Sequence, residues 1–172
     1  MARNVEIKAR IESIEALLPK AMVLADCGPF EIVQDDTFFQ CDAGRMKLRV
    51  LSPNEGQLIF YTRSDQQDPK ESFYIISPTA SPDTLREVLS LAYGQAGRVR
   101  KHRTLFLVGR TRVHLDRVEG LGHFLELEVV LSENETPESA IEVARGLMVQ
   151  FGIGQEQLVG CAYVDLLAQR SA

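Results

Sequence analysis

The 172-residue chain has 45% hydrophobic and 25% charged side chains, a net charge of −5 and a pI near 5.3. This size and balance predict one globular domain over residues 1–172, and the acidic charge argues against a general nucleic-acid binder, which would carry an overall basic footprint. No run approaches the roughly 18 apolar residues that span a membrane, and no apolar signal region precedes the first alternating segment. We therefore expect a cytoplasmic protein that binds neither nucleic acid nor membrane, and a homodimer is permitted.

Cysteine and histidine spacing gives no sign of a zinc site. Cys27, Cys41 and Cys161 are three in number, so they cannot all pair within the chain, and none lies in a CxxC arrangement. The histidines lack a metal-ligand spacing such as HExxH. Reduced thiols are therefore expected rather than a disulfide framework.

The first part of the chain predicts a strand, a helix and a second strand. Residues 4–11 alternate between apolar and polar side chains, as in a half-buried strand. Apolar positions at helical spacing predict a helix over 13–25, capped by Ser13 and kinked or shortened by Pro19. Aromatic and β-branched residues predict the second strand over 30–40.

The middle of the chain predicts further hairpins and a helix. Residues 45–51 alternate strictly, with cations on one face and apolar side chains on the other. Turn residues separate this strand from predicted strands over 57–65 and 71–78. Residues 81–92 have Ser at the N-cap, Pro at the first helical position and an apolar stripe that includes Val88, which predicts a helix.

The last part of the chain predicts a hairpin between two further elements. A strand is predicted over 97–109, and residues 111–131 form two alternating arms around a glycine turn. A long helix follows over 136–151 and ends at a glycine. Residues 158–169 are expected to close the fold as a short helical or extended segment.

Charged side chains recur on one face of these strands. On the hairpin, His114 shares that face and is expected to pair with a neighbouring acid. About eight antiparallel strands can close into a barrel that holds one small ligand. If the apolar faces turn towards the helices, the other faces collect eight cations and four carboxylates: Lys8, Arg45, Lys47, Arg49, Arg63, Lys101, Arg103 and Arg112, with Glu6, Asp116, Glu126 and Glu128.

This concentration of charge predicts a site for a metal-bound polyanion. Like charges that face one another in a closed barrel repel unless a polyanion lies between them, and phosphate is the natural candidate. Glu126 and Glu128 project from one strand and are expected to share a hard divalent cation with Glu6 and Asp116. The alternative is an open sheet whose charges pair among themselves in water.

Several segments resemble the CYTH superfamily, whose members form a triphosphate tunnel and include class IV adenylyl cyclases, thiamine triphosphatases and inorganic triphosphatases. VEIKAR resembles the N-terminal ExExK signature, DDTFF the aromatic second strand and RMKLRV the basic strand. VHLDRVEGLGHFLELEVVL resembles the late acidic hairpin, closest to the class IV cyclase branch, and YVDLL follows near the end. The resemblance implies an α+β fold, with an antiparallel eight-stranded barrel surrounded by peripheral helices.

The resemblance also implies roles for individual residues. Glu6, Glu126 and Glu128 would hold magnesium or manganese. Lys8, Arg103 and Asp116 would be catalytic. The phosphate-binding set would be Lys8, Arg45, Lys47, Arg49, Arg63, Lys101, Arg103 and Arg112.

Two positions depart from the family pattern. Asn4 stands where the ExExK signature has its first Glu, which removes one carboxylate ligand. The segment FYTRSD lacks the usual lysine followed by Gly-Pro, which leaves the role of Arg63 less secure than that of Lys47 or Arg49.

The sequence supports a metal-dependent enzyme that acts on a nucleoside or inorganic triphosphate. In a class IV cyclase, the 3′-hydroxyl of ATP attacks the α-phosphorus and pyrophosphate leaves; in a triphosphatase, water attacks the terminal phosphorus. A third interpretation is a polyphosphate or nucleotide binding module that has lost its chemistry through Asn4. A lipocalin-like carrier of an apolar ligand conflicts with the charge alternation.

Overall fold

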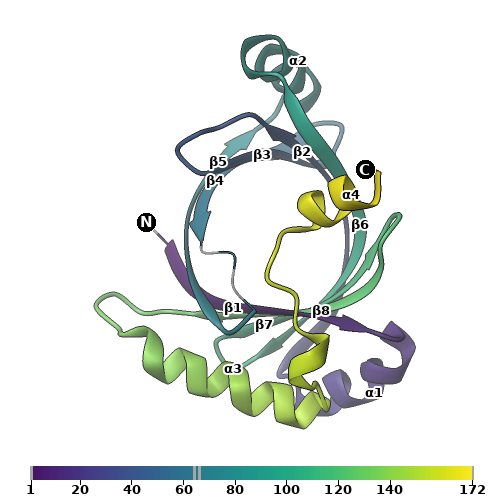
Figure 1. The fold of residues 1–172 in the computed structure, drawn as a ribbon, viewed down its shortest axis with the longest axis vertical. Helices are drawn as coiled ribbons and strands as arrows, with labels where there is room; N and C mark the ends of the chain where they lie inside the picture. Colours follow the sequence, from purple (N-terminus) through teal and green to yellow (C-terminus); the bar gives the residue numbers. More distant parts are fainter. Residues whose placement is uncertain (1, 64, 66, 172) are drawn as a thin grey trace.

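The computed structural model describes residues 2–63, 65 and 67–171. Eight antiparallel strands close into a barrel in the order β1-β5-β4-β3-β2-β6-β7-β8 (Figure 1), which confirms the predicted α+β barrel architecture. The strands are β1 (Ala2–Ile11), β2 (Cys27–Phe39), β3 (Arg45–Ser52), β4 (Glu55–Arg63), β5 (Lys70–Thr79), β6 (Gln95–Val108), β7 (Thr111–Val118) and β8 (Gly122–Val130). The helices are α1 (Ile14–Leu24), α2 (Pro82–Tyr93), α3 (Pro137–Phe151) and α4 (Tyr163–Ser171), with a 3₁₀ turn over Gln155–Gln157.

The main hydrophobic core lies outside the barrel, between its wall and two helices. Ile7 and Ala9 on the outer face of β1 pack with Phe106 of β6 and with Leu147 and Phe151 of α3. Figure 1 shows α1 and α3 beneath β1, β7 and β8, while α2 lies on the opposite side of the barrel. Burying such a side chain stabilises the fold by roughly 1.5–3 kcal/mol. Because these apolar residues pack outward, the alternate, polar residues of the same strands face the barrel interior.

Strand register brings the charged residues into facing pairs. Glu6 lies opposite Glu128 and Lys8 opposite Glu126 where β1 pairs with β8. Asp36 lies opposite Arg49 across β2 and β3. The same relation recurs across β6 and β7, where Arg103 lies opposite Asp116. Side chains that are far apart in the sequence therefore lie at cross-strand distance, about 4.5–5.5 Å between Cβ atoms.

The helices match the predicted positions, with two differences in detail. In α1, Ser13 caps the helix by accepting a hydrogen bond from the backbone N–H of Ala16 at 3.1 Å, and the helix continues through Pro19 instead of ending there. In α2, Leu89 is buried, but Val88 from the predicted apolar stripe is 55% exposed. The helix therefore covers β2, β3 and β4 with a narrower stripe than its sequence indicated.

The C-terminal segment closes one end of the barrel. Leu158 bridges to Ala9, and the backbone N–H of Val159 donates to the Lys8 carbonyl at 2.9 Å. The ammonium of Lys70 donates to the Gly160 carbonyl at 2.5 Å. In Figure 1 this segment passes across the barrel opening before it enters α4. We call residues 158–163 the C-terminal plug.

The end of the barrel opposite the plug is open to solvent. Along β5, the inward-facing side chains run from Lys70, at the plug, through Ser72 and Tyr74 to Ile76. Ile76 is 43% exposed although it faces the interior, whereas Phe124, which packs beside the plug on β8, has no exposed surface. A ligand can therefore enter the barrel past Ile76.

Two further expectations concern the whole chain. Across residues 2–63, 65 and 67–171, no helix combines the length and apolarity required to cross a bilayer. The three cysteines are free, as their spacing predicts.

Candidate functional site

The barrel encloses a cavity of about 310 Å³ that receives side chains from all eight strands and from the plug. The structure therefore brings together residues that are spread from the first strand to the end of the late hairpin. The predicted site residues that line this cavity are Glu6, Lys8, Lys47, Arg49, Lys101, Arg103, Arg112, Glu126 and Glu128.

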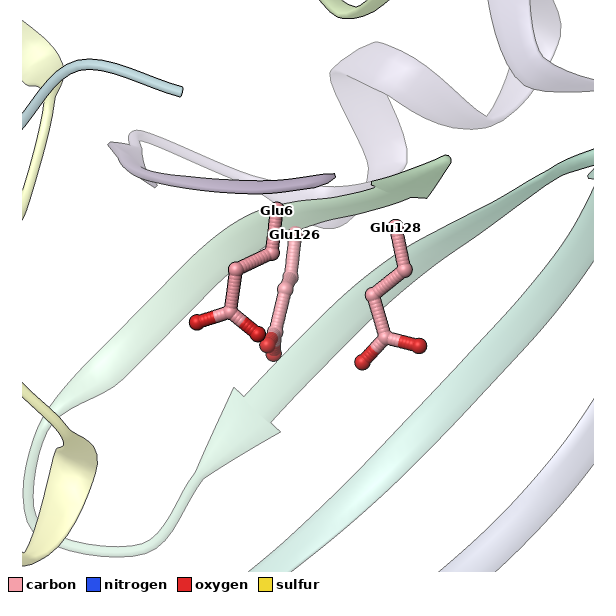
Figure 2. A group of neighbouring side chains, drawn as sticks. All are labelled: Glu6, Glu126 and Glu128. Atoms are coloured by element: carbon pink, nitrogen blue, oxygen red, sulfur yellow. The ribbon is translucent and has the colours of Figure 1, made fainter. Parts of the chain in front are cut away.

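Three carboxylates converge on one wall of the cavity. Glu6 of β1 and Glu126 and Glu128 of β8 each offer an oxygen atom, and these atoms all lie within 4.8 Å of one another. Figure 2 shows the three side chains projecting in the same direction from the adjacent strands. Such an all-oxygen, anionic group suits magnesium or manganese, which prefer hard oxygen ligands.

Glu126 remains ionised although it is buried, and so does the partly buried Glu128. Burial alone would raise the pKa of Glu126, but Lys8 and Arg103 lower it well below its ordinary value. For Glu128, burial again opposes ionisation, while the charges of Arg112 and Arg103 lower the pKa. Two anionic ligands are therefore available at neutral pH, and the residues present fit a divalent cation.

Asn4 lies in the same cavity and retains an oxygen where the family signature has a carboxylate. Its side chain is buried, and within the described ranges its Oδ1 atom has no hydrogen-bond partner. A carboxamide oxygen is a neutral ligand for hard cations. The substitution therefore removes a negative charge from the site but not an oxygen atom.

A buried aspartate holds the two cations of β3. Asp36 accepts hydrogen bonds from Lys47 Nζ at 2.8 Å and from Arg49 Nε and Nη2, both at 2.8 Å. Burial opposes ionisation of Asp36, but Arg49 and Lys47 lower its pKa well below the ordinary value. Burial, together with the charge of Arg49, lowers the pKa of Lys47 to about 7. We call Asp36, Lys47 and Arg49 the β3 clamp.

A second aspartate holds the equivalent cations of β6. Asp116 accepts hydrogen bonds from Lys101 Nζ at 3.0 Å and from Arg103 Nε and Nη2, both at 2.7 Å. The hydroxyl of Tyr163 donates to the same carboxylate at 3.0 Å. Arg103 Nη2 also donates to Glu126 at 2.9 Å. This bond links the group to Glu6, Glu126 and Glu128, which we call the carboxylate wall. We call Asp116, Lys101 and Arg103 the β6 clamp.

Asp116 itself has no exposed surface and lies behind the two cations. Burial would raise its pKa, but Arg103 and Lys101 hold it well below the ordinary value. The sequence predicts that this carboxylate is catalytic and shares the cation, but the group of carboxylates that could hold a metal consists of Glu6, Glu126 and Glu128. The position of Asp116 instead fits a role in orienting Lys101 and Arg103, which do line the cavity.

The remaining charged groups of the cavity lie next to the plug or the carboxylates. Lys8 Nζ lies 4.1 Å from the ring centroid of Tyr163 and 3.4 Å from the carbonyl oxygen of Cys161, to which it donates. Arg112 Nε donates to Glu128 at 2.8 Å. His114 Nδ1 lies 3.9 Å from Glu128 Oε1, too far for the hydrogen bond that its predicted pairing would make. Burial and Arg103 lower the pKa of His114 to about 4, so its imidazole is neutral at pH 7.

Arg45 lies outside the main cavity. It lines a separate hollow of about 520 Å³ between β3 and α4. Its guanidinium donates to both carboxylate oxygens of Asp165, at 3.0 and 2.8 Å, and to Asp65 at 3.3 Å. Arg45 is the first residue of β3, where acids from α4 and the loop after β4 neutralise it. The side chain of Arg63 lies outside the described residues, so its expected role stays a prediction.

Sequence reasoning missed several residues of the cavity, among them Gln34 and Asp36, which line it from β2. It also missed the contact that Tyr163 of the plug makes with Asp116. The alternation of Gln34, Asp36 and Phe38 along the second strand was a usable signal, because all three share one face. Nothing in the local sequence around Tyr163 indicates that its hydroxyl reaches Asp116, 47 residues away in the chain.

The fold and the site together define a class of enzymes. Its members have a closed antiparallel barrel whose interior holds paired cations opposite a group of carboxylates. The profile of the CYTH domain matches residues 2–159, and the chain belongs to this family.

Individual relatives agree with this assignment. Adenylate cyclase CyaB from Aeromonas hydrophila is 24% identical over 177 residues, which cover 96% of this chain and 89% of the relative. Among solved structures, the PH1012 protein from Pyrococcus horikoshii OT3 has a TM-score of 0.84 at 22% identity, covering 95% of this chain and 98% of its own. The candidate adenylyl cyclase HpAC1 from Hippeastrum has a TM-score of 0.67 at 17% identity, covering 99% and 96%. These structures share the fold.

Proposed function

We propose that this protein is a metal-dependent enzyme of the adenylyl cyclase branch, which converts ATP to cyclic AMP and pyrophosphate. The observation that carries the proposal is the convergence of Glu6, Glu126 and Glu128 within 4.8 Å in the cavity that also holds both clamps. Its family contains adenylyl cyclases and triphosphatases, and the relative from Aeromonas hydrophila is a cyclase.

The clamps are suited to bind the polyphosphate and to stabilise the leaving group. In the cyclase reaction, the 3′-hydroxyl oxygen bonds to the α-phosphorus while the bond to the α,β-bridging oxygen breaks and pyrophosphate leaves with its electron pair. Lys47 and Arg49 line the cavity and neutralise the charge that develops on pyrophosphate. Asp36 holds both cations in place before the substrate arrives, so little reorganisation is needed during the reaction.

The carboxylate wall is suited to hold a metal ion at the phosphate that reacts. Magnesium or manganese held by Glu6, Glu126 and Glu128 would supply Lewis-acid polarisation of the phosphate oxygens. Lys8 lies opposite Glu126 in the strand pairing and Arg103 donates to it, so both cations flank the same phosphate. His114 lines the cavity with a neutral imidazole, which can accept the proton of the attacking hydroxyl.

A triphosphatase is the second candidate. HpAC1, which shares the fold, has a dominant triphosphatase activity. The same cations would stabilise the transition state when water, rather than a ribose hydroxyl, attacks the terminal phosphorus. The two reactions differ in which phosphorus lies at the carboxylate wall.

Product analysis separates the two candidates. The purified protein is incubated with ATP and with tripolyphosphate in magnesium or in manganese. Cyclic AMP with pyrophosphate supports the cyclase, and orthophosphate supports the triphosphatase. The Glu126→Gln variant should abolish either activity, because it removes a metal-ligand charge. Neither product from either substrate would reject both candidates.

A further inference from the structure

The C-terminal segment is fixed to two strands on nearly opposite sides of the barrel. At its first end, the backbone N–H of Val159 donates to the Lys8 carbonyl of β1 at 2.9 Å. At its other end, Asp165 of α4 accepts two hydrogen bonds from the guanidinium of Arg45, at 3.0 and 2.8 Å. Arg45 begins β3, which is separated from β1 by β4 and β5 on one side and by β2, β6, β7 and β8 on the other. The C-terminal plug therefore spans this end of the barrel between two anchors (Figure 1).

The carboxylate of Asp165 joins the second anchor to the plug. Its Oδ2 atom accepts a hydrogen bond from the backbone N–H of Ala162 at 3.0 Å as well as the bond from Arg45. Asp165 lies in the first turn of α4, where a negative charge is favourable beside the positive end of the helix dipole. A bidentate arginine–carboxylate pair is also more directional than a single ion pair. Arg45 therefore fixes the start of α4, and with it Tyr163, relative to β3.

The ring of Tyr163 connects the plug to two cations of the cavity. Its centroid lies 4.1 Å from Lys8 Nζ and 5.0 Å from Lys101 Nζ, both within the range of an attractive cation–π interaction. The ring is buried and packs edge-to-face on Phe124, with 4.9 Å between the ring centroids. One aromatic ring therefore contributes to the position of two lysines, from β1 and β6, that line the cavity.

Arg45 lies in a space separate from the proposed phosphate site. It lines the hollow between β3 and α4, and its side chain is 26% exposed. Phe38 and Tyr61 line both this hollow and the barrel cavity, so their rings separate Arg45 from the barrel interior. Any effect of Arg45 on a ligand in the barrel therefore runs through the residues that it holds.

We propose that Arg45 is a positioning residue, which holds the plug closed through Asp165 and so keeps Lys8 and Lys101 oriented towards a polyphosphate. This inference rests on the proposed function, because it assumes that a polyphosphate lies at these lysines. It differs from direct phosphate binding by Arg45 in what Asp165 does. If Arg45 bound phosphate directly, removal of Asp165 would release the guanidinium and strengthen binding. If Arg45 positions the plug, removal of Asp165 weakens binding, as removal of Arg45 does.

Two measurements on the full-length protein test this role. Calorimetric titration with tripolyphosphate in EDTA measures the affinity of the cations without a metal. The rate at which iodoacetamide alkylates Cys161, followed by peptide mass spectrometry, measures opening of the plug, because Cys161 lies in the plug and is partly buried. The variants are Arg45→Met, Arg45→Lys and Asp165→Ala. Arg45→Lys keeps the charge, so it carries the test if Arg45→Met does not fold.

Two matched controls remove a comparable charge outside the plug. Arg98→Met breaks another bidentate pair on the barrel surface, in which Arg98 donates to Asp35 at 2.7 and 2.6 Å. Asp65→Ala removes the second carboxylate that accepts a hydrogen bond from Arg45, at 3.3 Å, which lies in the loop after β4. The exposed Cys27 is the internal reference for alkylation. Thermal unfolding of each variant verifies that it folds.

Arg45→Met and Asp165→Ala should each weaken tripolyphosphate binding about tenfold and raise the alkylation rate of Cys161 about tenfold. Arg45→Lys should lie between these variants and the wild type, because lysine lacks the bidentate geometry. The controls should change neither quantity. Unchanged or tighter binding in Asp165→Ala, or unchanged alkylation in Arg45→Met, would overturn the positioning role and leave the triphosphate function standing. Failure of the wild-type protein to bind tripolyphosphate would overturn both.

Discussion

The two clamps share one design and differ in their surroundings. Each consists of a Lys-x-Arg pair on one strand and an aspartate on the adjacent strand that accepts hydrogen bonds from both cations. In the β3 clamp, the side chains of Lys47 and Arg49 are 15% and 14% exposed. In the β6 clamp, those of Lys101 and Arg103 are 5% and 6% exposed. The first clamp is therefore more accessible to a ligand.

Additional partners reinforce this difference. The β6 clamp also bonds to Tyr163 of the plug and to Glu126 of the carboxylate wall. It therefore connects the metal-binding residues to the element that closes the barrel. The hydrogen bonds described for the β3 clamp join Lys47 and Arg49 to Asp36 alone. We infer that the β6 clamp mainly stabilises the site and that the β3 clamp mainly binds phosphate.

The largest expected effect is the loss of the aspartate from the β6 clamp. Asp116→Ala leaves two cations buried without their main partner, so it should lower the free energy of unfolding by about 3–5 kcal/mol. Asp36→Ala should cost about 1–3 kcal/mol, because Lys47 and Arg49 face the accessible cavity. Urea unfolding followed by circular dichroism measures both values. Equal losses would remove the distinction between the clamps.

The second-largest effect is expected on catalysis when the lysine of the β3 clamp is removed. Lys47→Met should reduce kcat/KM about 100-fold, the usual consequence of removing one preorganised group that stabilises transition-state charge. Its stability should change little, because the variant removes an ammonium that is unfavourably buried.

Arg100→Met is the matched control for this variant, because Arg100 is an exposed cation on β6, next to Lys101 in sequence. It should retain the wild-type rate. A Lys47→Met protein that is folded and fully active would show that the β3 clamp does not bind the substrate.

The pH dependence of binding gives a smaller effect. The pKa of Lys47 is about 7, below its ordinary value of 10.5, so the ammonium loses its proton as pH rises above 7. Tripolyphosphate affinity should then fall, by up to about tenfold per pH unit, until the pKa of the bound state is reached. Lys47→Arg should flatten this profile, because guanidinium remains charged. Calorimetric titration from about pH 6 to about pH 9 covers the range.

The same shift predicts the opposite trend for stability. Between pH 7 and 10.5 the unfolded chain binds more protons at Lys47 than the folded chain does. The free energy of unfolding contributed by this group therefore rises with pH across that window, and the unfavourable contribution is complete below pH 7. The free energy of unfolding of the wild type, measured relative to that of Lys47→Met, should therefore rise with pH across this window. A constant difference would contradict a depressed pKa.

The smallest effect is expected at the link between the β6 clamp and the plug. Tyr163→Phe removes the hydroxyl that donates to Asp116, which should lower the free energy of unfolding by about 1 kcal/mol. Tyr93→Phe on the exposed surface of α2 is the control and should be neutral. Activity should stay close to wild type. A loss of activity as large as that of Lys47→Met would assign Tyr163 to substrate binding instead.

Most of the barrel could be predicted because alternation has a single meaning in a closed sheet. One face of each strand must point inward, so the pattern of 45–51 was sufficient to place Lys47 and Arg49 inside. Alternation does not predict where a residue lies along the barrel axis. Arg45 belongs to the same face but lies at the end of the strand, where it donates hydrogen bonds to Asp165.

Other features could not be predicted because they depend on contacts distant in sequence. Asp36 shows the right alternation, but only the pairing of β2 with β3 reveals that it faces Arg49. The path of the plug depends on packing between residues 158–163 and both β1 and β5. The exposure of Val88 depends on how α2 lies over its neighbouring strands, which helical periodicity does not specify.

The central claim is that a metal-bound polyanion occupies the barrel between the carboxylates and the β3 clamp. A crystal structure with manganese and tripolyphosphate, using anomalous scattering to locate the metal, tests this directly. We predict a manganese peak in contact with Glu6, Glu126 and Glu128, and phosphate oxygens in contact with Lys47 and Arg49. Manganese bound elsewhere, or tripolyphosphate bound outside the barrel, would contradict the account.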